Sequence, residues 1–199
     1  MNSVNHKYHH GNLRGEILRA AYNFVQENGY TAMSLRGIAD ECDVSATAIY
    51  RHYRTKEHLL ADVVVKGFEE FTISIEGNEG ADIFNKCENY LKFAFDNKNI
   101  YDLLFSQSVV EFLKFPEILE VADDAFKTFL ESVKDHDKTL NDLSASNKAI
   151  HIWSFLHGIS SISKKMEIAL GLPDKEMTVP VRSVKRAREN LRQFIEDLF

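Results

Sequence analysis

The chain has 199 residues, 44% of them hydrophobic, and a formal net charge of −6. No stretch approaches the roughly 18 uninterrupted apolar residues that a membrane helix needs, which argues against a membrane protein. The first 16 residues lack the apolar core of a secretory signal, and the two cysteines, Cys42 and Cys87, have no metal-ligand spacing, so we expect a reduced, cytoplasmic protein with buried thiols.

The charge is distributed unevenly along the chain. Residues 1–67 hold eight Lys/Arg against seven Asp/Glu, together with five of the eight histidines. Residues 68–199 hold 16 Lys/Arg against 23 Asp/Glu. A basic balance confined to the first third is expected if only that part of the chain meets phosphate.

The hydrophobic periodicity of the first third is helical. Apolar residues predict a helix over 12–28, closed by Gly29 at a position where a left-handed residue is favoured. The segment 35–56 then predicts two short helices around a tight turn, with Ser34 and Ser45 as their N-caps. This pattern is typical of a helix-turn-helix, whose second helix enters a major groove of DNA.

The rest of the chain is also predicted to be helical. A longer helix capped by Thr55 should run over about 56–74, and the two glycines within 77–81 mark the clearest break in the chain. No segment alternates in the manner of a strand, so we expect an all-α fold. It divides into a helix-turn-helix head at 1–55, a connecting helix at about 56–76 and a helical-bundle body at 77–199. Further helices are expected near 81–96, 100–113, 117–135, 145–170 and 182–198.

The most specific motif is the string TAIYRHYRTKEHLL at 47–60. Together with the run from Leu13 to Gly29, it resembles the TetR family of bacterial transcriptional repressors. The resemblance implies a three-helix DNA-binding head on an all-helical body that binds a ligand and dimerises. The string YHHGNLR at 8–14 and the motif of Trp153, His157 and Gly158 resemble the subgroup whose body is called the WHG domain.

Several residues of the predicted head are suited to binding the DNA backbone. The resemblance implies phosphate contacts for Tyr50 and Lys56, and a contact at the groove edge for Arg36. A cation in the first turn of a helix is mildly unfavourable, so Lys56 is better explained by a phosphate that the helix N-terminus also contacts. His52 either donates to a phosphate or packs within the head, whereas Tyr53 is expected in the core.

Fewer residues are candidates for reading bases. Arg51 has the fork that pairs with guanine O6 and N7, although a phosphate contact alone stays open, and Thr47 offers a hydroxyl or a methyl group. Ala48 offers only apolar contact with a thymine methyl. The predicted DNA-binding set is Arg36, Ser45, Thr47, Ala48, Tyr50, Arg51, His52 and Lys56.

A histidine cluster near the N-terminus could suggest a metal site, but its spacing matches no closed set of ligands. We interpret His6, Lys7, His9, His10 and Arg14 as a flexible arm that touches phosphate. No metal, cofactor or catalytic residue is predicted, because paired carboxylates, a nucleophile elbow and a phosphate loop are all missing from the sequence. The alternatives to a regulator are a helical small-molecule carrier or enzyme, and an architectural DNA-binding protein without effector control.

The body is rich in aromatic residues, some of which could line an apolar pocket. The resemblance implies an effector site within 81–170, although ordinary core packing is the alternative for each residue. His157 is expected as a hydrogen-bonded core residue. The candidates for the pocket are Phe93, Tyr101, Phe105, Phe126 and Trp153.

The last predicted helix has one apolar face and could form a four-helix seam with the 145–170 helix of a second copy. The small residues Gly158, Ser160 and Ser161 would let another helix approach closely. The resulting prediction is a homodimeric repressor on a palindromic operator, modulated by an unknown small molecule, with no membrane partner. The candidates for the seam are Ile162, Met166, Ala187, Leu191 and Phe194.

Overall fold

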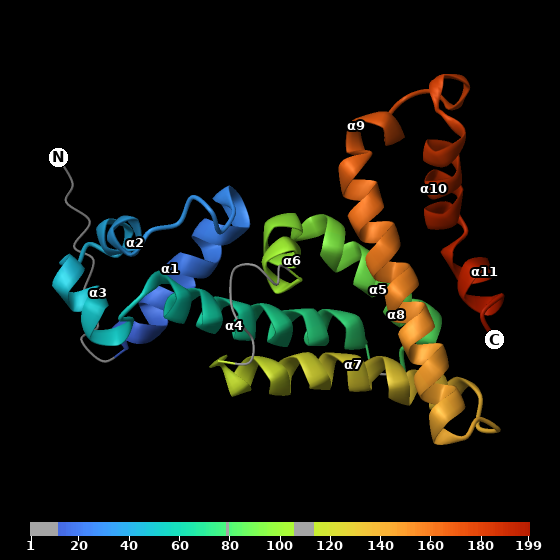
Figure 1. The fold of residues 1–199 in the computed structure, drawn as a ribbon, viewed down its shortest axis with the longest axis horizontal. Helices are drawn as coiled ribbons and strands as arrows, with labels where there is room; N and C mark the ends of the chain where they lie inside the picture. Colours follow the sequence, from blue (N-terminus) through green and yellow to red (C-terminus); the bar gives the residue numbers. More distant parts are fainter. Residues whose placement is uncertain (1–11, 79, 106–113) are drawn as a thin grey trace. The chain divides into compact units, whose positions relative to one another are not determined.

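The computed structural model describes residues 12–78, 80–105 and 114–199, and these residues are all-α, without a strand (Figure 1). No helix among them is long and apolar enough to cross a membrane. The helices are α1 (Leu13–Asn28), α2 (Leu35–Glu41), α3 (Ala46–His52), α4 (Lys56–Glu76), α5 (Ile83–Asp96), α6 (Lys98–Leu104), α7 (Pro116–His136), α8 (Asp142–Lys165), α9 (Glu167–Leu170), α10 (Val179–Glu189) and α11 (Leu191–Glu196), with a 3₁₀ turn at Asp174–Glu176.

The predicted all-α fold is confirmed, and most predicted helices end within about three residues of the observed bounds. Two predictions of continuous helices are wrong. The helix expected over 145–170 ends at Lys165, where Met166 caps it before the short α9. The helix expected over 182–198 is interrupted at Asn190, whose side-chain amide donates to the carbonyl of Arg186 at 2.9 Å. Most of the predicted 100–113 helix lies outside the described residues.

The described residues divide into two compact units. The first unit holds those of 1–67 and 99–118, and the second holds those of 68–98 and 119–199. The chain passes from one unit to the other within α4, at the start of α6 and again within α7. Helix α6 therefore packs with the N-terminal helices, whereas the sequence assigns it to the body. That 1–55 forms a domain of its own stays a prediction.

Within the first unit, α6 contacts both α1 and α4. The side-chain amide of Asn99 donates to the carbonyl of Gln26 near the end of α1, at 2.9 Å. Gly67 on α4 is buried, and a Cβ there would lie 2.8 Å from Cδ2 of Leu104 and 3.2 Å from Cγ2 of Ile100. The missing side chain of Gly67 is what allows α6 to approach α4 this closely.

The second unit is built around aromatic rings from several helices. The Phe71 ring of α4 lies 5.1 Å from Tyr90 and 5.0 Å from Phe93, both on α5. Tyr90 in turn lies 5.8 Å from Phe129 on α7 and 6.2 Å from Trp153 on α8, with edge-to-face geometry in both pairs. Contacts of this kind stabilise by about 0.5–1.5 kcal/mol beyond the area that they bury. They fix α5, α7 and α8 around one core.

The two cysteines differ in burial. Cys87 lies in the core of the second unit, and burial raises the pKa of its thiol, so the predicted buried thiol is confirmed there. Cys42 is only half-buried, at the end of α2, and burial raises the pKa of its thiol as well. The prediction of a buried thiol is therefore wrong for Cys42, because it lies at a turn rather than on the inner face of a helix.

Candidate nucleic-acid interface

Helices α2 and α3 form a helix-turn-helix within the first unit. The turn between them includes Asp43, whose φ of 53° is left-handed, a conformation that aspartate tolerates better than most residues. The backbone N–H of Val44 donates to the carbonyl of Ala39 at 3.0 Å, and Ala39 is only 1% exposed. A small buried residue and a tight turn hold α2 and α3 against each other.

Serine side chains begin both helices of the motif. The Oγ of Ser34 accepts from the backbone N–H of Gly37 at 3.0 Å, and the Oγ of Ser45 accepts from that of Ala48 at 3.2 Å. Both predicted N-caps are therefore confirmed. Ser45 is also exposed, so its predicted role in DNA binding is compatible with capping but is not required to explain the residue.

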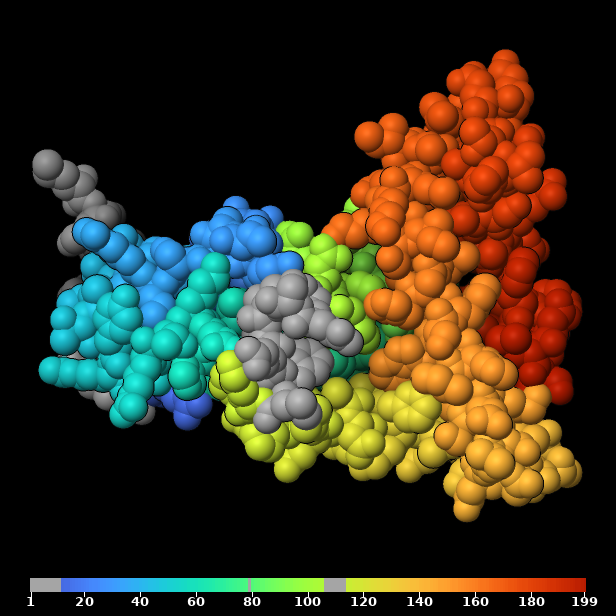
Figure 2. All heavy atoms as spheres, viewed as in Figure 1, coloured from blue at the N-terminus to red at the C-terminus, as the bar shows by residue number. Residues whose placement is uncertain are grey.

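The free face of α3 follows from the burial of Ile49, which is fully inaccessible and anchors the helix to the first unit. Tyr50 is 53% exposed beside it. In Figure 2, α2 and α3 (blue to cyan) reach the surface of this unit. Arg36, Thr47, Arg51 and His52 are exposed, whereas Ala48 is half-buried.

Arg54 is a further exposed cation, immediately after α3. It is not among the contacts predicted from the sequence, although it lies within the motif that carries the family resemblance. Arg36, Arg51 and Arg54 are thus three exposed guanidinium groups on or next to α2 and α3, and arginine is the side chain best suited to bidentate contacts with phosphates and guanines. The surface is therefore chemically suited to a DNA duplex.

Lys56, at the first position of α4, contacts the protein itself. Its Nζ donates to the carbonyl of Thr31 at 3.2 Å, and burial lowers its pKa. An ammonium has three donors, so this contact leaves Lys56 able to bind a phosphate as well. Thr55 caps the helix as predicted, since its Oγ1 accepts from the backbone N–H of His58 at 3.3 Å.

Arg14, Tyr53 and Asp62 form a cluster that ties together three parts of the first unit. Asp62 on α4 accepts from the Tyr53 hydroxyl at 2.7 Å and from Arg14 on α1 at 2.8 Å. The Arg14 guanidinium also lies over the Tyr53 ring, 5.7 Å from its centroid. The interpretation of Arg14 as part of a flexible arm is wrong, because Arg14 lies within α1 and pairs with α4. His6, Lys7, His9 and His10 lie outside the described residues.

Burial and these contacts shift two of the pKa values in the cluster. Hydrogen bonding to Tyr53, followed by that to Asp62, raises the pKa of Arg14. Desolvation raises the pKa of Tyr53 to about 12, and the residue is only 2% exposed, which confirms its expected place in the core. At neutral pH the Tyr53 hydroxyl therefore keeps its proton and donates a hydrogen bond to Asp62.

The five residues predicted to line an effector pocket lie in both units. The ring centroids of Phe126 and Trp153 are 5.2 Å apart in the second unit, which also holds Phe93. The ring centroids of Tyr101 and Phe105 are 4.7 Å apart in the first unit. Of the five, Phe93 and Tyr101 are buried, whereas Phe105, Phe126 and Trp153 are half-buried, and the effector pocket stays a prediction.

His157 on α8 is half-buried, and burial lowers its pKa. The sequence predicts it as a fully internal residue with a hydrogen bond. Its burial is therefore less complete than predicted, because His157 lies beside Leu156, which takes the inner position on the helix.

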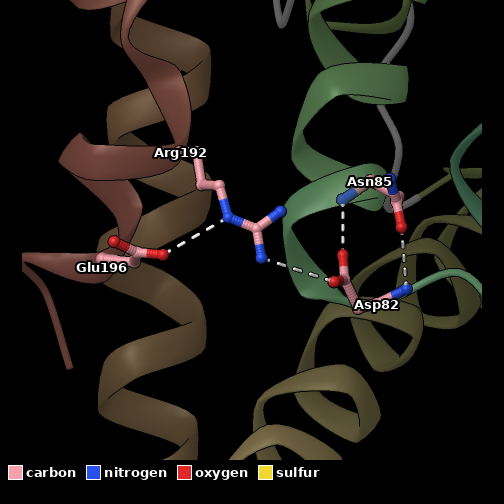
Figure 3. Close-up of polar contacts among 4 residues, drawn as sticks. All are labelled: Asp82, Asn85, Arg192 and Glu196. Carbon is pink, nitrogen blue, oxygen red and sulfur yellow. Dashed lines mark hydrogen bonds and ion pairs between the residues drawn. The ribbon is translucent and has the colours of Figure 1, made fainter.

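A groove of about 770 Å³ lies in the second unit among α5, α9, α10 and α11, outside the predicted pocket residues. Two arginines on its wall lie over rings of α5: Arg188 is 4.1 Å from the centroid of Phe95, and Arg192 is 4.1 Å from that of Phe84. Figure 3 shows Arg192 between Glu196, at 3.3 Å, and Asp82, at 3.9 Å. Arg188 and Arg192 therefore hold the C-terminal helices against α5.

The predicted dimer residues differ in exposure. Ile162 and Phe194 are each 41% exposed, and the Phe194 ring stacks on Phe155 at 5.8 Å. Met166 is half-buried. Ala187 and Leu191 are only 5% and 6% exposed, which leaves them little surface to offer a partner.

Comparison with known proteins gives two matches to sequence models of one family. A model described as bacterial regulatory proteins, tetR family, matches residues 17–63, and a model described as a tetracyclin repressor-like C-terminal domain matches 83–178. Together they span more than half of the chain. The C-terminal match does not confirm the WHG subgroup.

Individual relatives match mainly in the N-terminal part. The transcriptional repressor KstR of Rhodococcus jostii is 34% identical over 56 residues, which are 28% of this chain and 26% of KstR. The regulator UidR of Escherichia coli is 32% identical over 68 residues, which are 32% of this chain and 35% of UidR. The matches thus cover between about a quarter and about a third of these relatives.

A solved structure shares the fold across almost the whole chain. The transcriptional regulator FadR from Bacillus subtilis, in complex with stearoyl-CoA, has a TM-score of 0.66 at 15% identity, covering 94% of this chain and 99% of FadR. The helix-turn-helix of α2 and α3, the all-helical fold and the two family matches show that this chain belongs to the TetR family of bacterial regulatory proteins.

Proposed function

We propose that this protein is a ligand-responsive transcriptional repressor that binds a palindromic DNA operator as a homodimer in the cytoplasm. The observation that carries the proposal is the outward face of α3, where Tyr50 and Arg51 are exposed beside the buried anchor Ile49. An exposed helix with this chemistry fits a major groove. The relative KstR is described as a repressor, which supports repression rather than activation.

The residues of this surface divide into two roles. Tyr50, His52 and Lys56 bind phosphates and set the register of the protein on the duplex. Arg51 and Thr47 read base edges, and Arg36 contacts the edge of the groove. In a homodimer, the two recognition helices would meet successive major grooves about 34–36 Å apart.

The effector acts by preferring one of two conformations. A ligand that binds both conformations equally shifts neither, so the effector must bind the conformation with low DNA affinity more tightly. We infer that it is a small molecule bound within 81–170, and that it changes the separation of the two recognition helices through α4. FadR was solved with stearoyl-CoA, which makes acyl thioesters a reasonable first class of compounds to screen.

The test is selection of bound sequences from random duplexes, followed by titration of the selected site at several salt concentrations. We expect a palindromic consensus and an affinity that falls steeply with salt, because several phosphates are bound. Screened metabolites should include one that weakens this binding. No binding even at low salt would favour a carrier or enzyme, and binding without sequence preference would favour an architectural protein.

A further inference from the structure

Asp62 is the one acidic residue in the apolar run of α4 from Leu59 to Val65. Its side chain is 22% exposed, while its neighbours Ala61 and Val63 are buried. A carboxylate in such a position costs desolvation free energy unless charge-assisted hydrogen bonds compensate it. The two donors that bind Asp62 are the Tyr53 hydroxyl and the Arg14 guanidinium.

Tyr53 is the residue that ends the recognition helix. Its backbone N–H donates to the carbonyl of Ile49 at 2.9 Å, which closes the last turn of α3. Arg51 and His52, two candidates for DNA contact, occupy that last turn. The helix has only seven residues, of which Ile49 alone is buried, so its orientation depends strongly on how its two ends are held.

The N-terminal end is held by the Ser45 cap, and the C-terminal end by the Tyr53–Asp62 bond. Arg14 adds α1 to this second attachment. Without the bond, the last turn of α3 would sample more orientations in the free protein. Binding DNA would then require ordering that turn, which costs affinity without removing any contact to the duplex.

We infer that Asp62 is a positioning residue for DNA recognition: it fixes the end of α3 through Tyr53, and Arg14 neutralises its charge. The inference rests on the proposed DNA-binding function of the first unit. It makes Asp62 and Tyr53 determinants of affinity although neither is among the exposed residues that face the duplex.

Whether neutralising Asp62 weakens or tightens DNA binding distinguishes this positioning role from simple electrostatic repulsion. Replacing an acid by a neutral residue beside a DNA-binding surface should tighten binding, since a repulsion of phosphate is removed. It should also release Arg14, which is 65% exposed, to bind a phosphate. The positioning role predicts the opposite result, weaker binding.

The experiment compares full-length Asp62→Asn and Tyr53→Phe with the wild type on the duplex selected above. We expect both variants to bind about tenfold more weakly, the size expected for one charge-assisted hydrogen bond. The double variant should lose little more than either single one, since both remove the same bond. The slope of log Kd against log salt should stay unchanged, because no phosphate contact is lost.

Glu57→Gln is the matched control, because it removes an acid from the first turn of the same helix. It should bind as tightly as the wild type or more tightly. Asp62→Glu, which keeps the charge, should recover part of the affinity. Thermal melting and hydrogen exchange of the α3 amides show whether each variant is folded and whether its recognition helix is loosened.

Wild-type affinity or tighter binding by both Asp62→Asn and Tyr53→Phe would overturn the inference, as would a flatter salt slope for Asp62→Asn. If Asp62→Asn does not fold, Tyr53→Phe decides alone, since it keeps the buried ring and deletes only the hydroxyl. Failure of the wild type to bind DNA would instead overturn the proposed function.

Discussion

Single residues of the recognition surface serve the fold and the proposed function together. Ser45 caps α3 and is exposed on it, and Lys56 binds the Thr31 carbonyl with only part of its donor capacity. A residue with two roles gives a mutant phenotype that must be separated into stability and binding. Arg51 is simpler, since among the contacts of the described residues none fixes its exposed side chain.

Arg51→Ala should reduce affinity for the selected operator by about 1–3 kcal/mol and relax the preference at one base pair, because a bidentate contact to guanine is lost. Competition titrations against single-base operator variants measure both effects. Arg54→Ala removes a neighbouring cation and should weaken specific and random duplexes alike. Equal losses on both kinds of duplex for Arg51→Ala would show that Arg51 binds only phosphate.

His157 should make stability depend on pH. Burial lowers the pKa of the folded histidine below its ordinary value of 6.5, so the unfolded chain binds the proton more readily. Stability is then fully present above about pH 6.5 and is lost as the pH falls below that value. Urea unfolding between pH 7.5 and pH 5 should show a smaller decrease for His157→Gln than for the wild type.

The exposed His151 on the same helix is the control for that experiment. His151→Gln should follow the wild type at every pH. An unchanged pH dependence in His157→Gln would mean that other groups cause the loss of stability in acid.

At the scale of elements, the sequence predicts local features well and non-local ones poorly. The caps at Ser34, Ser45 and Thr55 and the end of α1 at Gly29 depend on neighbouring residues, and all are confirmed. The Tyr53–Asp62 bond joins two helices, so no spacing reveals it. The only sequence signal is an acid within an apolar run.

The breaks at Met166 and Asn190 were beyond prediction for a related reason. The apolar positions of 182–198 keep a helical period across Asn190, and asparagine is only a moderately poor helix former. The interruption follows from the side-chain bond to the Arg186 carbonyl and from packing of Leu191 and Ile195 within the second unit. Local propensity does not contain that packing.

Comparing Ser34 with Ser45 separates the stabilising effect of a helix cap from a direct contact with DNA. Ser34→Ala and Ser45→Ala should each destabilise the protein by about 0.5–2 kcal/mol, since each removes one capping bond. If Ser45 also contacts the backbone of DNA, Ser45→Ala should weaken binding more than Ser34→Ala does. If the two variants lose the same stability and bind DNA equally well, Ser45 acts only as a helix cap.

At the scale of the whole molecule, the proposed homodimer requires an apolar surface that one chain leaves uncovered. Ile162 on α8 and Phe194 on α11 are such residues, whereas Ala187 and Leu191 are used within the chain. Gly158 on α8 belongs with the first pair, since a Cβ built there meets no atom within 4 Å. A seam centred on Gly158 and Ile162 is therefore better supported than the full set predicted from sequence.

Gly158→Ala tests this seam because it should raise the stability of the monomer and lower the affinity of dimerisation. In the monomer, alanine should stabilise α8 by about 0.8–1 kcal/mol through helix propensity. At a close helix–helix contact, the new methyl should instead weaken dimerisation. Sedimentation over a range of concentrations and melting at low concentration separate the two, and a dimer as tight as the wild type would exclude Gly158 from the seam.

The attachment of α6 to α1 and α4 limits how regulators of this kind can be recombined. A chimaera that joins residues 1–67 to the remainder of another regulator would bring in a foreign counterpart of α6. That helix would need a side chain that donates to the Gln26 carbonyl, which is the role of Asn99 in this chain. It would also need side chains that fit against Gly67, as those of Leu104 and Ile100 do. A new ligand specificity could therefore be grafted onto these recognition residues if α6 is kept from this chain or if its replacement carries equivalent side chains.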